Sequence, residues 1–144
     1  MATTPFPLRS PAEKVGGLVH FGRMLDKICA HERGALPAEY VFNLGKGFDG
    51  RCVRFLGVKH EDLAARAKDG ATDEEILNWA FEHGRKPSEE EMEIWNEFMR
   101  KCGWNDDVSE TLTRRKKESV LSERDDIQTM FNYIDVDEGR VPRR

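Results

Sequence analysis

The sequence lacks the features that mark membrane and secreted proteins. No stretch approaches the roughly 20 apolar residues that a membrane-spanning helix needs, and the first residues hold no apolar core of signal-peptide length. The three cysteines, Cys29, Cys52 and Cys102, are odd in number, and none lies within metal-clamp spacing of another. These absences argue against a disulfide scaffold and a local zinc site. We therefore expect free thiols in a soluble cytoplasmic protein with no membrane contact, no metal and no cofactor.

The sequence also lacks an excess of basic charge and the proline, serine or glutamine tracts that are typical of disorder. It has 23 basic and 27 acidic residues among 144, and its net charge of -4 makes nucleic acid an unlikely partner. Charged residues make up 35% of the chain, whereas about 25% is usual in globular proteins. Such mixed charge suits the solvent faces of helices, and the length suits one domain.

Helix-start signals recur along the chain. Capping boxes, in which a hydroxyl residue precedes an acid by three positions, begin at Ser10, Thr72 and Ser88. Apolar residues then follow at three- and four-residue steps, which favours amphipathic helices. Gly16 and Gly17 are the weak point of the first helix, because each costs about 0.8–1.0 kcal/mol in a helix interior. The predicted helices cover about 11–33, 50–56, 60–68, 73–83, 89–102, 108–121 and 123–138, with a single turn near 37–40.

These signals predict an all-α fold. We expect a compact orthogonal array of about six to seven short helices with no significant sheet, because helices of this length pack obliquely. The expected organisation is an extended N-terminal arm over 1–9, a single helical domain over 10–139 and a frayed C-terminal tail over 140–144. Phe6 and Leu8 are the residues of the arm that can pack on the core.

Four strings of the sequence carry a resemblance to a known family. They lie at 44–52, 72–77, 87–96 and 124–131. Together, and in this order, they resemble a family of small bacterial proteins classed as domain of unknown function five-zero-six-nine, over roughly residues 8–140. The resemblance implies a bacterial, helical and soluble protein. It implies no activity, cofactor or catalytic residue.

A glycine-rich loop and the helix that follows it, residues 44–57, form the first candidate site. Three glycines leave backbone N–H groups accessible, and three cations lie within nine residues, a pattern that can cradle a phosphate or carboxylate. The spacing is not that of a Walker motif. The alternative is a tight connection in which the glycines satisfy sterics and Asp49 caps a helix. The candidate ligand-binding residues are Lys46, Gly47, Asp49, Arg51, Arg54 and, from the first helix, His20.

Two classes of function follow from this loop. The first is a small binding or interaction domain that takes a small anionic ligand at 44–57. The second is an enzyme acting on a small anionic substrate, with Asp49 or His20 as base and Arg51 as substrate clamp. Asp49 used as a helix cap would favour the first, whereas a cleft that holds Asp49, His20 and Arg51 together would favour the second. Whether the protein also binds a protein partner or a second copy of itself stays open.

Cys52 is the one cysteine placed where a thiolate could be stabilised. It lies near a predicted helix start and between Arg51 and Arg54, and both features lower the pKa of a thiol. The hypothesis of a reactive thiol stands beside the plainer interpretation of Cys52 as a small buried apolar residue.

Overall fold

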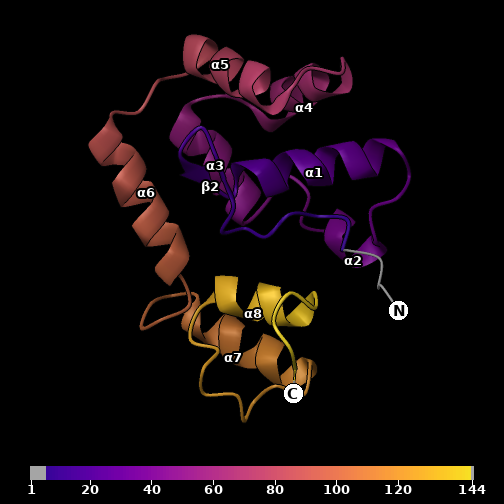
Figure 1. Cartoon of the computed structure of the whole chain (residues 1–144), viewed down its shortest axis with the longest axis vertical. Coiled ribbons are helices and arrows are strands. Elements are labelled where there is room, and N and C mark those ends of the chain that lie inside the picture. The colour runs from indigo at the N-terminus through magenta and orange to yellow at the C-terminus, as the bar shows by residue number, and fades with distance from the viewer. Residues whose placement is uncertain (1–5, 144) are drawn as a thin grey trace. The chain divides into compact units, whose positions relative to one another are not determined.

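The computed structural model describes residues 6–143. Over these residues it contains eight helices and one two-stranded sheet (Figure 1). The contacts divide them into an N-terminal unit, Pro7–Glu93, and a C-terminal unit of 94–143 with Phe6. In chain order the elements are β1 (Lys14–Val15), β2 (Leu18–Val19), α1 (Phe21–Glu32), α2 (Ala38–Val41), α3 (Phe48–Leu56), α4 (His60–Lys68), α5 (Asp73–His83), α6 (Glu89–Lys101), α7 (Ser109–Glu118) and α8 (Met130–Asp137).

The mostly helical prediction is confirmed, but the first predicted helix is wrong over its N-terminal half. Residues 14–19 form a hairpin in which β1 pairs antiparallel with β2. Gly16 has φ 56° and Gly17 has φ 88°, and two central residues with positive φ suit a two-residue hairpin loop. A Cβ on Gly16 would lie 2.2 Å from Cδ2 of Leu77 on α5. The two glycines therefore serve a tight turn and a close approach, and α1 begins only after His20.

The predicted starts of α5 and α6 are confirmed. The Thr72 hydroxyl accepts a hydrogen bond from the Glu75 amide, and the Glu75 carboxylate accepts one from the Thr72 amide. Ser88 and Glu91 exchange the same two bonds at the start of α6. Each box satisfies amide groups that the first helical turn leaves without a partner. These helices begin where they do for reasons contained in four consecutive residues.

The last helix begins later than predicted. The sequence predicted a helix from residue 123, but Thr129 is the N-cap of α8, and its hydroxyl accepts a hydrogen bond from the Asn132 backbone amide at 3.1 Å. In the segment that precedes it, Arg124 binds the Asp126 carboxylate through two nitrogens, each at 2.8 Å. Arg124 also donates to the carbonyls of the C-terminal residues 142 and 143. The sequence predicted a frayed tail over residues 140–144 and did not predict these hydrogen bonds.

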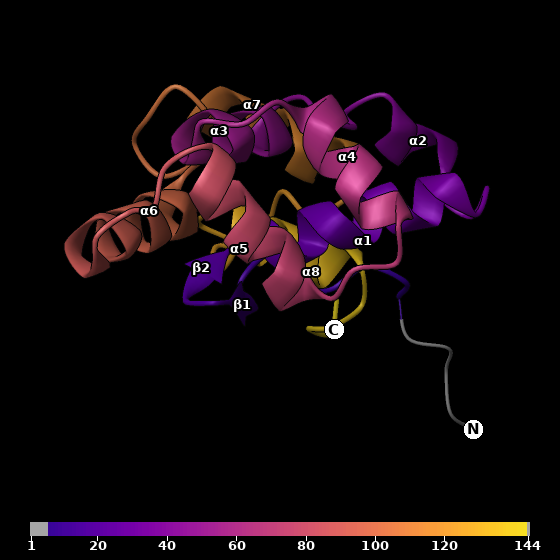
Figure 2. The same ribbon diagram turned by 90° about the horizontal axis from the view of Figure 1, so that it is seen from above.

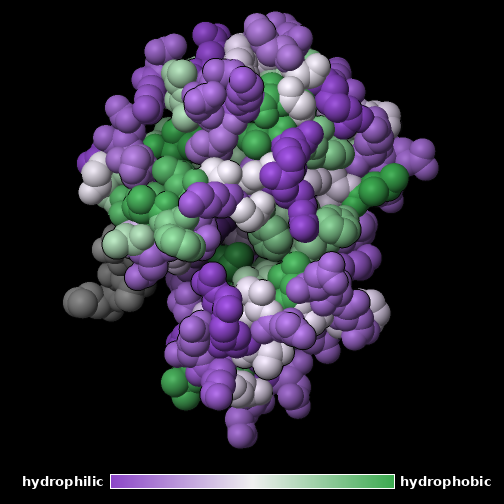
Figure 3. All heavy atoms as spheres, turned by 180° about the vertical axis from the view of Figure 1, so that it is seen from behind, coloured by the Kyte–Doolittle hydropathy of each residue, from purple (hydrophilic) through white to green (hydrophobic). Residues whose placement is uncertain are grey.

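Helix α1 forms the centre of the N-terminal unit. The hairpin, α3 and α4 contact it, while α5 contacts α4 and β1 (Figure 1 and Figure 2). The buried apolar side chains of this unit include Leu8, Leu18, Phe21, Met24, Leu25, Leu56 and Leu63. The face shown in Figure 3 is mostly hydrophilic, with apolar side chains in smaller patches. No helix among the described residues has both the length and the apolar character to cross a membrane.

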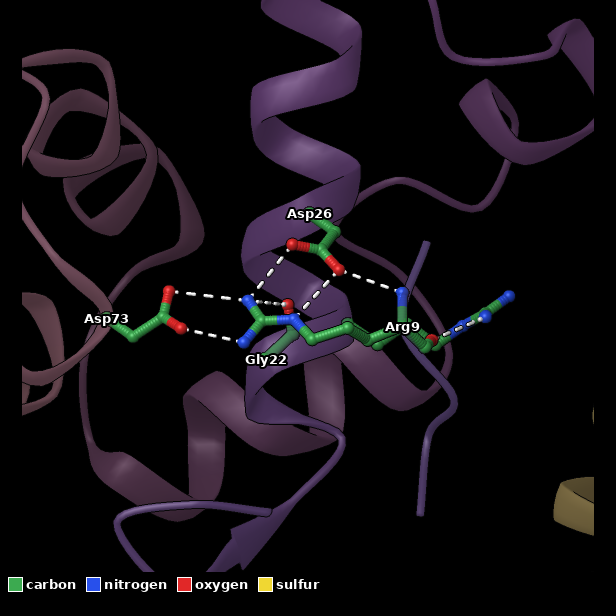
Figure 4. Close-up of polar contacts among 5 residues, drawn as sticks. Arg9, Gly22, Asp26 and Asp73 are labelled. Carbon is green, nitrogen blue, oxygen red and sulfur yellow. Dashed lines mark hydrogen bonds and ion pairs between the residues drawn. The ribbon is translucent and has the colours of Figure 1, made fainter. Parts of the chain in front are cut away.

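Arg9 fastens the segment before the hairpin to two helices (Figure 4). Its guanidinium binds the carboxylate of Asp26 on α1, with Nε at 2.9 Å, and that of Asp73 at the start of α5, with Nη1 at 2.7 Å. It also donates to the carbonyl of Gly22, and the Arg9 amide donates to Asp26. These bonds raise the pKa of Arg9 above its ordinary value, and the bond to Asp73 is the main cause. We call these contacts the Arg9 clamp.

Candidate functional site

Asp49 lies in the first turn of α3, and its carboxylate is completely buried. Lys27 of α1 places Nζ 2.8 Å from Oδ2, and His20 places Nε2 2.7 Å from Oδ1. The Gly45 amide donates to Oδ2 at 3.1 Å, so the carboxylate also closes the glycine-rich loop. The N-cap of α3 is Gly47. The alternative in which Asp49 serves as a helix cap is therefore wrong, because its carboxylate is bound by groups from α1 and the loop.

The charges of this buried cluster follow from its contacts. Burial opposes ionisation of Asp49, but the bonds from His20 and Lys27 outweigh it and lower the pKa of the carboxyl well below its ordinary value. Burial lowers the pKa of His20 despite the attraction of Asp49. At neutral pH the cluster thus holds an ionised Asp49 and a neutral His20 imidazole, with the Lys27 side chain against the carboxylate. A neutral His20 must carry its proton on Nε2, because that atom faces the carboxylate.

This tautomer leaves Nδ1 of His20 with a lone pair. Nδ1 is buried and has no hydrogen-bond partner within the described residues, which is unusual because buried polar atoms are nearly always bonded. The ring meets Phe48 edge-on, with 5.9 Å between centroids. The unpaired nitrogen therefore belongs to a residue whose opposite nitrogen is fixed by Asp49.

The backbone of His20 is strained. Its φ of 70° and ψ of -27° lie in the left-handed region, where residues other than glycine cost of order 1–3 kcal/mol. The His20 amide donates to the Pro11 carbonyl at 2.8 Å, and its own carbonyl accepts from the Met24 amide at 2.9 Å. Strain of this kind persists only where surrounding contacts enforce it, and it is commoner at functional sites than elsewhere.

His60 at the start of α4 is a second histidine beside the loop. A Cβ on Gly45 would lie 3.1 Å from its Nδ1, and Gly45 has φ 77°, so the loop passes the imidazole where only glycine fits well. Burial lowers the pKa of His60. Its Nε2 is also buried and lacks a hydrogen-bond partner in the part of the chain that the structure describes. Two histidines with an unpaired nitrogen thus flank the same loop.

The three basic residues predicted to bind an anion, Lys46, Arg51 and Arg54, lie on the outer side of residues 44–57. Lys46 is exposed, and its Nζ lies 5.2 Å from the ring centroid of Phe42. The Arg51 guanidinium lies 5.8 Å from the Phe48 centroid, and Arg54 is exposed on the next turn of α3. The cation paired with the Asp49 carboxylate is therefore Lys27, which the sequence analysis did not single out. The structure brings His20 and Asp49 together, and leaves the three cations at the surface or half-buried.

The sequence matches the model of a family described as Domain of unknown function (DUF5069), over residues 6–140. The chain belongs to this family. The match confirms the resemblance drawn from the four strings. No curated protein matches the sequence.

Cys52 of this DUF5069 protein does not have the surroundings of a reactive thiol. Its side chain is completely buried on α3. Burial, with a smaller contribution from the nearby charge of Asp49, raises the pKa of the thiol well above its ordinary value. Both effects oppose formation of a thiolate, so the contacts support the plainer interpretation of Cys52 as a small core residue. Within the described residues, no three His, Cys, Asp or Glu side chains are grouped so that they could hold a metal ion.

Two residues of the DUF5069 site escaped the sequence analysis. Lys27 follows His20 by seven residues, or about two helical turns, which places both on one side of α1. A lysine beside the apolar stripe of a helix was the available signal. His60 carried no signal of its own, because its position beside Gly45 depends on how α4 packs against the loop.

Proposed function

We propose that this DUF5069 protein is a small helical binding domain that takes a small anionic molecule at residues 44–57. One observation carries the proposal. Between Glu39 and Glu61 the only acid in the sequence is Asp49, whereas Lys46, Arg51 and two further cations lie in the same stretch. Asp49 is buried and already neutralised by Lys27. The outer side of the segment therefore carries more basic than acidic side chains, in a chain whose net charge is -4.

The backbone supports the same proposal. Gly47 is exposed, with φ 55°, directly before the nine residues of α3. The N-terminus of a helix carries partial positive charge that favours anions. A Cβ added to Gly47 would meet no atom within 4 Å, so an anion has room to approach the main chain there. Exposed cations and an open glycine at a helix start are the elements that phosphate and carboxylate sites combine.

A titration with inorganic phosphate tests the proposal. In two-dimensional amide NMR spectra, we expect phosphate to shift the signals of Gly47 and its neighbours first. Replacing both Lys46 and Arg51 by glutamine should weaken binding at least tenfold, because a hydrogen bond to a charged group contributes about 1.5–3 kcal/mol. Arg66→Gln is the matched control, since Arg66 is an exposed arginine on α4. Unchanged affinity in the double variant, or equal loss in the control, would overturn the proposal.

An enzyme that acts on a small anionic substrate is the second candidate. The observation that favours it is the unpaired Nδ1 of His20, on an imidazole that Asp49 holds from the other side. A neutral imidazole fixed by a carboxylate suits a general base, and its free nitrogen would take the proton from substrate.

Diethyl pyrocarbonate, which acylates neutral imidazoles, tests whether His20 becomes accessible. The exposed residues His31 and His83 serve as internal references. An enzyme requires His20 to react in the folded protein and to be protected by phosphate. If only the two reference histidines are modified, His20 is a structural residue and the second candidate fails.

A further inference from the structure

Aromatic rings and cations alternate along the proposed anion site. Phe42 and Phe48 lie in the same short stretch as Lys46 and Arg51, and each cation is held near one ring, Lys46 at 5.2 Å and Arg51 at 5.8 Å from the centroid. Phe42 is 74% exposed, whereas Phe48 is half-buried. The segment therefore presents a flat apolar surface directly beside positive charge.

The exposed ring of Phe42 favours some anionic ligands over others. A large aromatic ring in water gains free energy when another flat apolar surface covers it. Inorganic phosphate or a small aliphatic acid would engage Lys46 and leave most of the ring in water. A ligand that carries a phosphate and a planar ring would use the charge and the exposed aromatic face together.

We propose that the ligand is a mononucleotide or a similar aromatic phosphate, whose ring stacks on Phe42 while Lys46 and Arg51 bind the phosphate. This inference rests on the proposed anion site and adds to it the chemical class of the ligand. Stacking of one base on an aromatic side chain is sequence-tolerant, because every base has a π-face. The site is accordingly expected to prefer aromatic over sugar phosphates more strongly than one base over another.

Three probes separate the two parts of the ligand. Adenosine monophosphate has the ring and the phosphate, ribose 5-phosphate lacks the ring, and adenosine lacks the phosphate. Calorimetric titration is expected to show adenosine monophosphate binding at least about fivefold more tightly than ribose 5-phosphate, the lower end of the range for base stacking. Phe42→Leu, which keeps an apolar side chain, should remove this advantage and leave the affinity for ribose 5-phosphate unchanged. Phe81→Leu is the matched control, because Phe81 also lies near a lysine, Lys86, at 5.9 Å.

Each outcome of these titrations tests one part of the proposal. Equal affinity for adenosine monophosphate and ribose 5-phosphate would overturn the aromatic ligand and leave the anion site standing. An advantage that survives Phe42→Leu, or that Phe81→Leu removes equally, would overturn the assignment to Phe42. Binding of neither phosphate would overturn the anion site itself, and binding of adenosine with the same affinity as its phosphate would do the same. The expected pattern is strong binding only of the probe with both parts, and only while Phe42 is present.

Discussion

Replacing Asp49 by asparagine removes the negative charge that Lys27 and His20 contact. The amide has the size of the carboxyl group, and its oxygen can still accept the bond from the Gly45 amide. Its NH2 group then stands in the place of Oδ1 and cannot accept the bond from His20. Lys27 is only 7% exposed, and it would be left as a buried cation without its carboxylate. Breaking a buried ion pair by removing one partner costs about 3–5 kcal/mol. That loss is a large share of the roughly 5–15 kcal/mol that stabilises a typical domain.

Urea unfolding followed by circular dichroism measures this loss as a difference in the free energy of unfolding. Lys27→Met should also destabilise the protein, since it leaves Asp49 buried without its cation. The double variant should lose less than the sum of the two single losses, because neither charge then remains unpaired. Asp125→Asn is the control, because Asp125 is exposed and such changes usually stay within about 0.5 kcal/mol. If Asp49→Asn proves as mild as this control, the buried pair does not have the energetic role assigned to it.

Three further predictions concern other features. Burial lowers the pKa of His20 and of His60. As the pH falls, the unfolded chain therefore binds protons at these histidines before the folded protein does, and the free energy of unfolding should fall below about pH 6.5. A urea midpoint that stays the same from about pH 7 to about pH 5 would contradict this. Arg9→Ala should cost about 2 kcal/mol in the same urea assay, because it leaves Asp26 without its main partner; a loss below about 0.5 kcal/mol would contradict it. Val120→Gly should raise the melting temperature and increase the free energy of unfolding by about 0.5–1 kcal/mol, because this valine has φ 59° and is 89% exposed. A lower melting temperature would show that the backbone strain at this position is not relieved.

The starts of α5 and α6 could be predicted because their causes are local, whereas the start predicted at Ser10 was wrong. Thr72 and Ser88 form their bonds with residues three positions ahead, and both capping boxes were identified from the sequence alone. The same method failed near Gly16, because its apolar neighbours satisfied a helical pattern that continued into α1. Two consecutive glycines are also a hairpin signal, and in the structure Gly16 lies against Leu77 where a side chain would not fit.

The candidate site could be predicted only in part. The glycine-rich loop drew attention to Asp49 and its neighbours, and His20 was named from its place in the first helix. The bond between His20 and Asp49 joins residues 29 positions apart, and no helical or strand period relates such positions. The place of Lys27 beside the apolar stripe of α1 indicated a buried lysine, but the sequence did not indicate that Asp49 is its partner.

The Arg9 clamp also bears on how the N-terminal unit folds. The bond from Arg9 to Asp73 joins residues 64 positions apart, and closing so long a loop costs chain entropy that contacts within a helix do not. The turns of α1 and α5 form through neighbours three and four positions away, whereas the clamp needs both helices in place first. We expect a contact of this kind to form late in folding, so that its loss would speed unfolding and leave the folding rate nearly unchanged. On this reasoning, the Arg9 clamp would slow the unfolding of the N-terminal unit more than it would speed its folding.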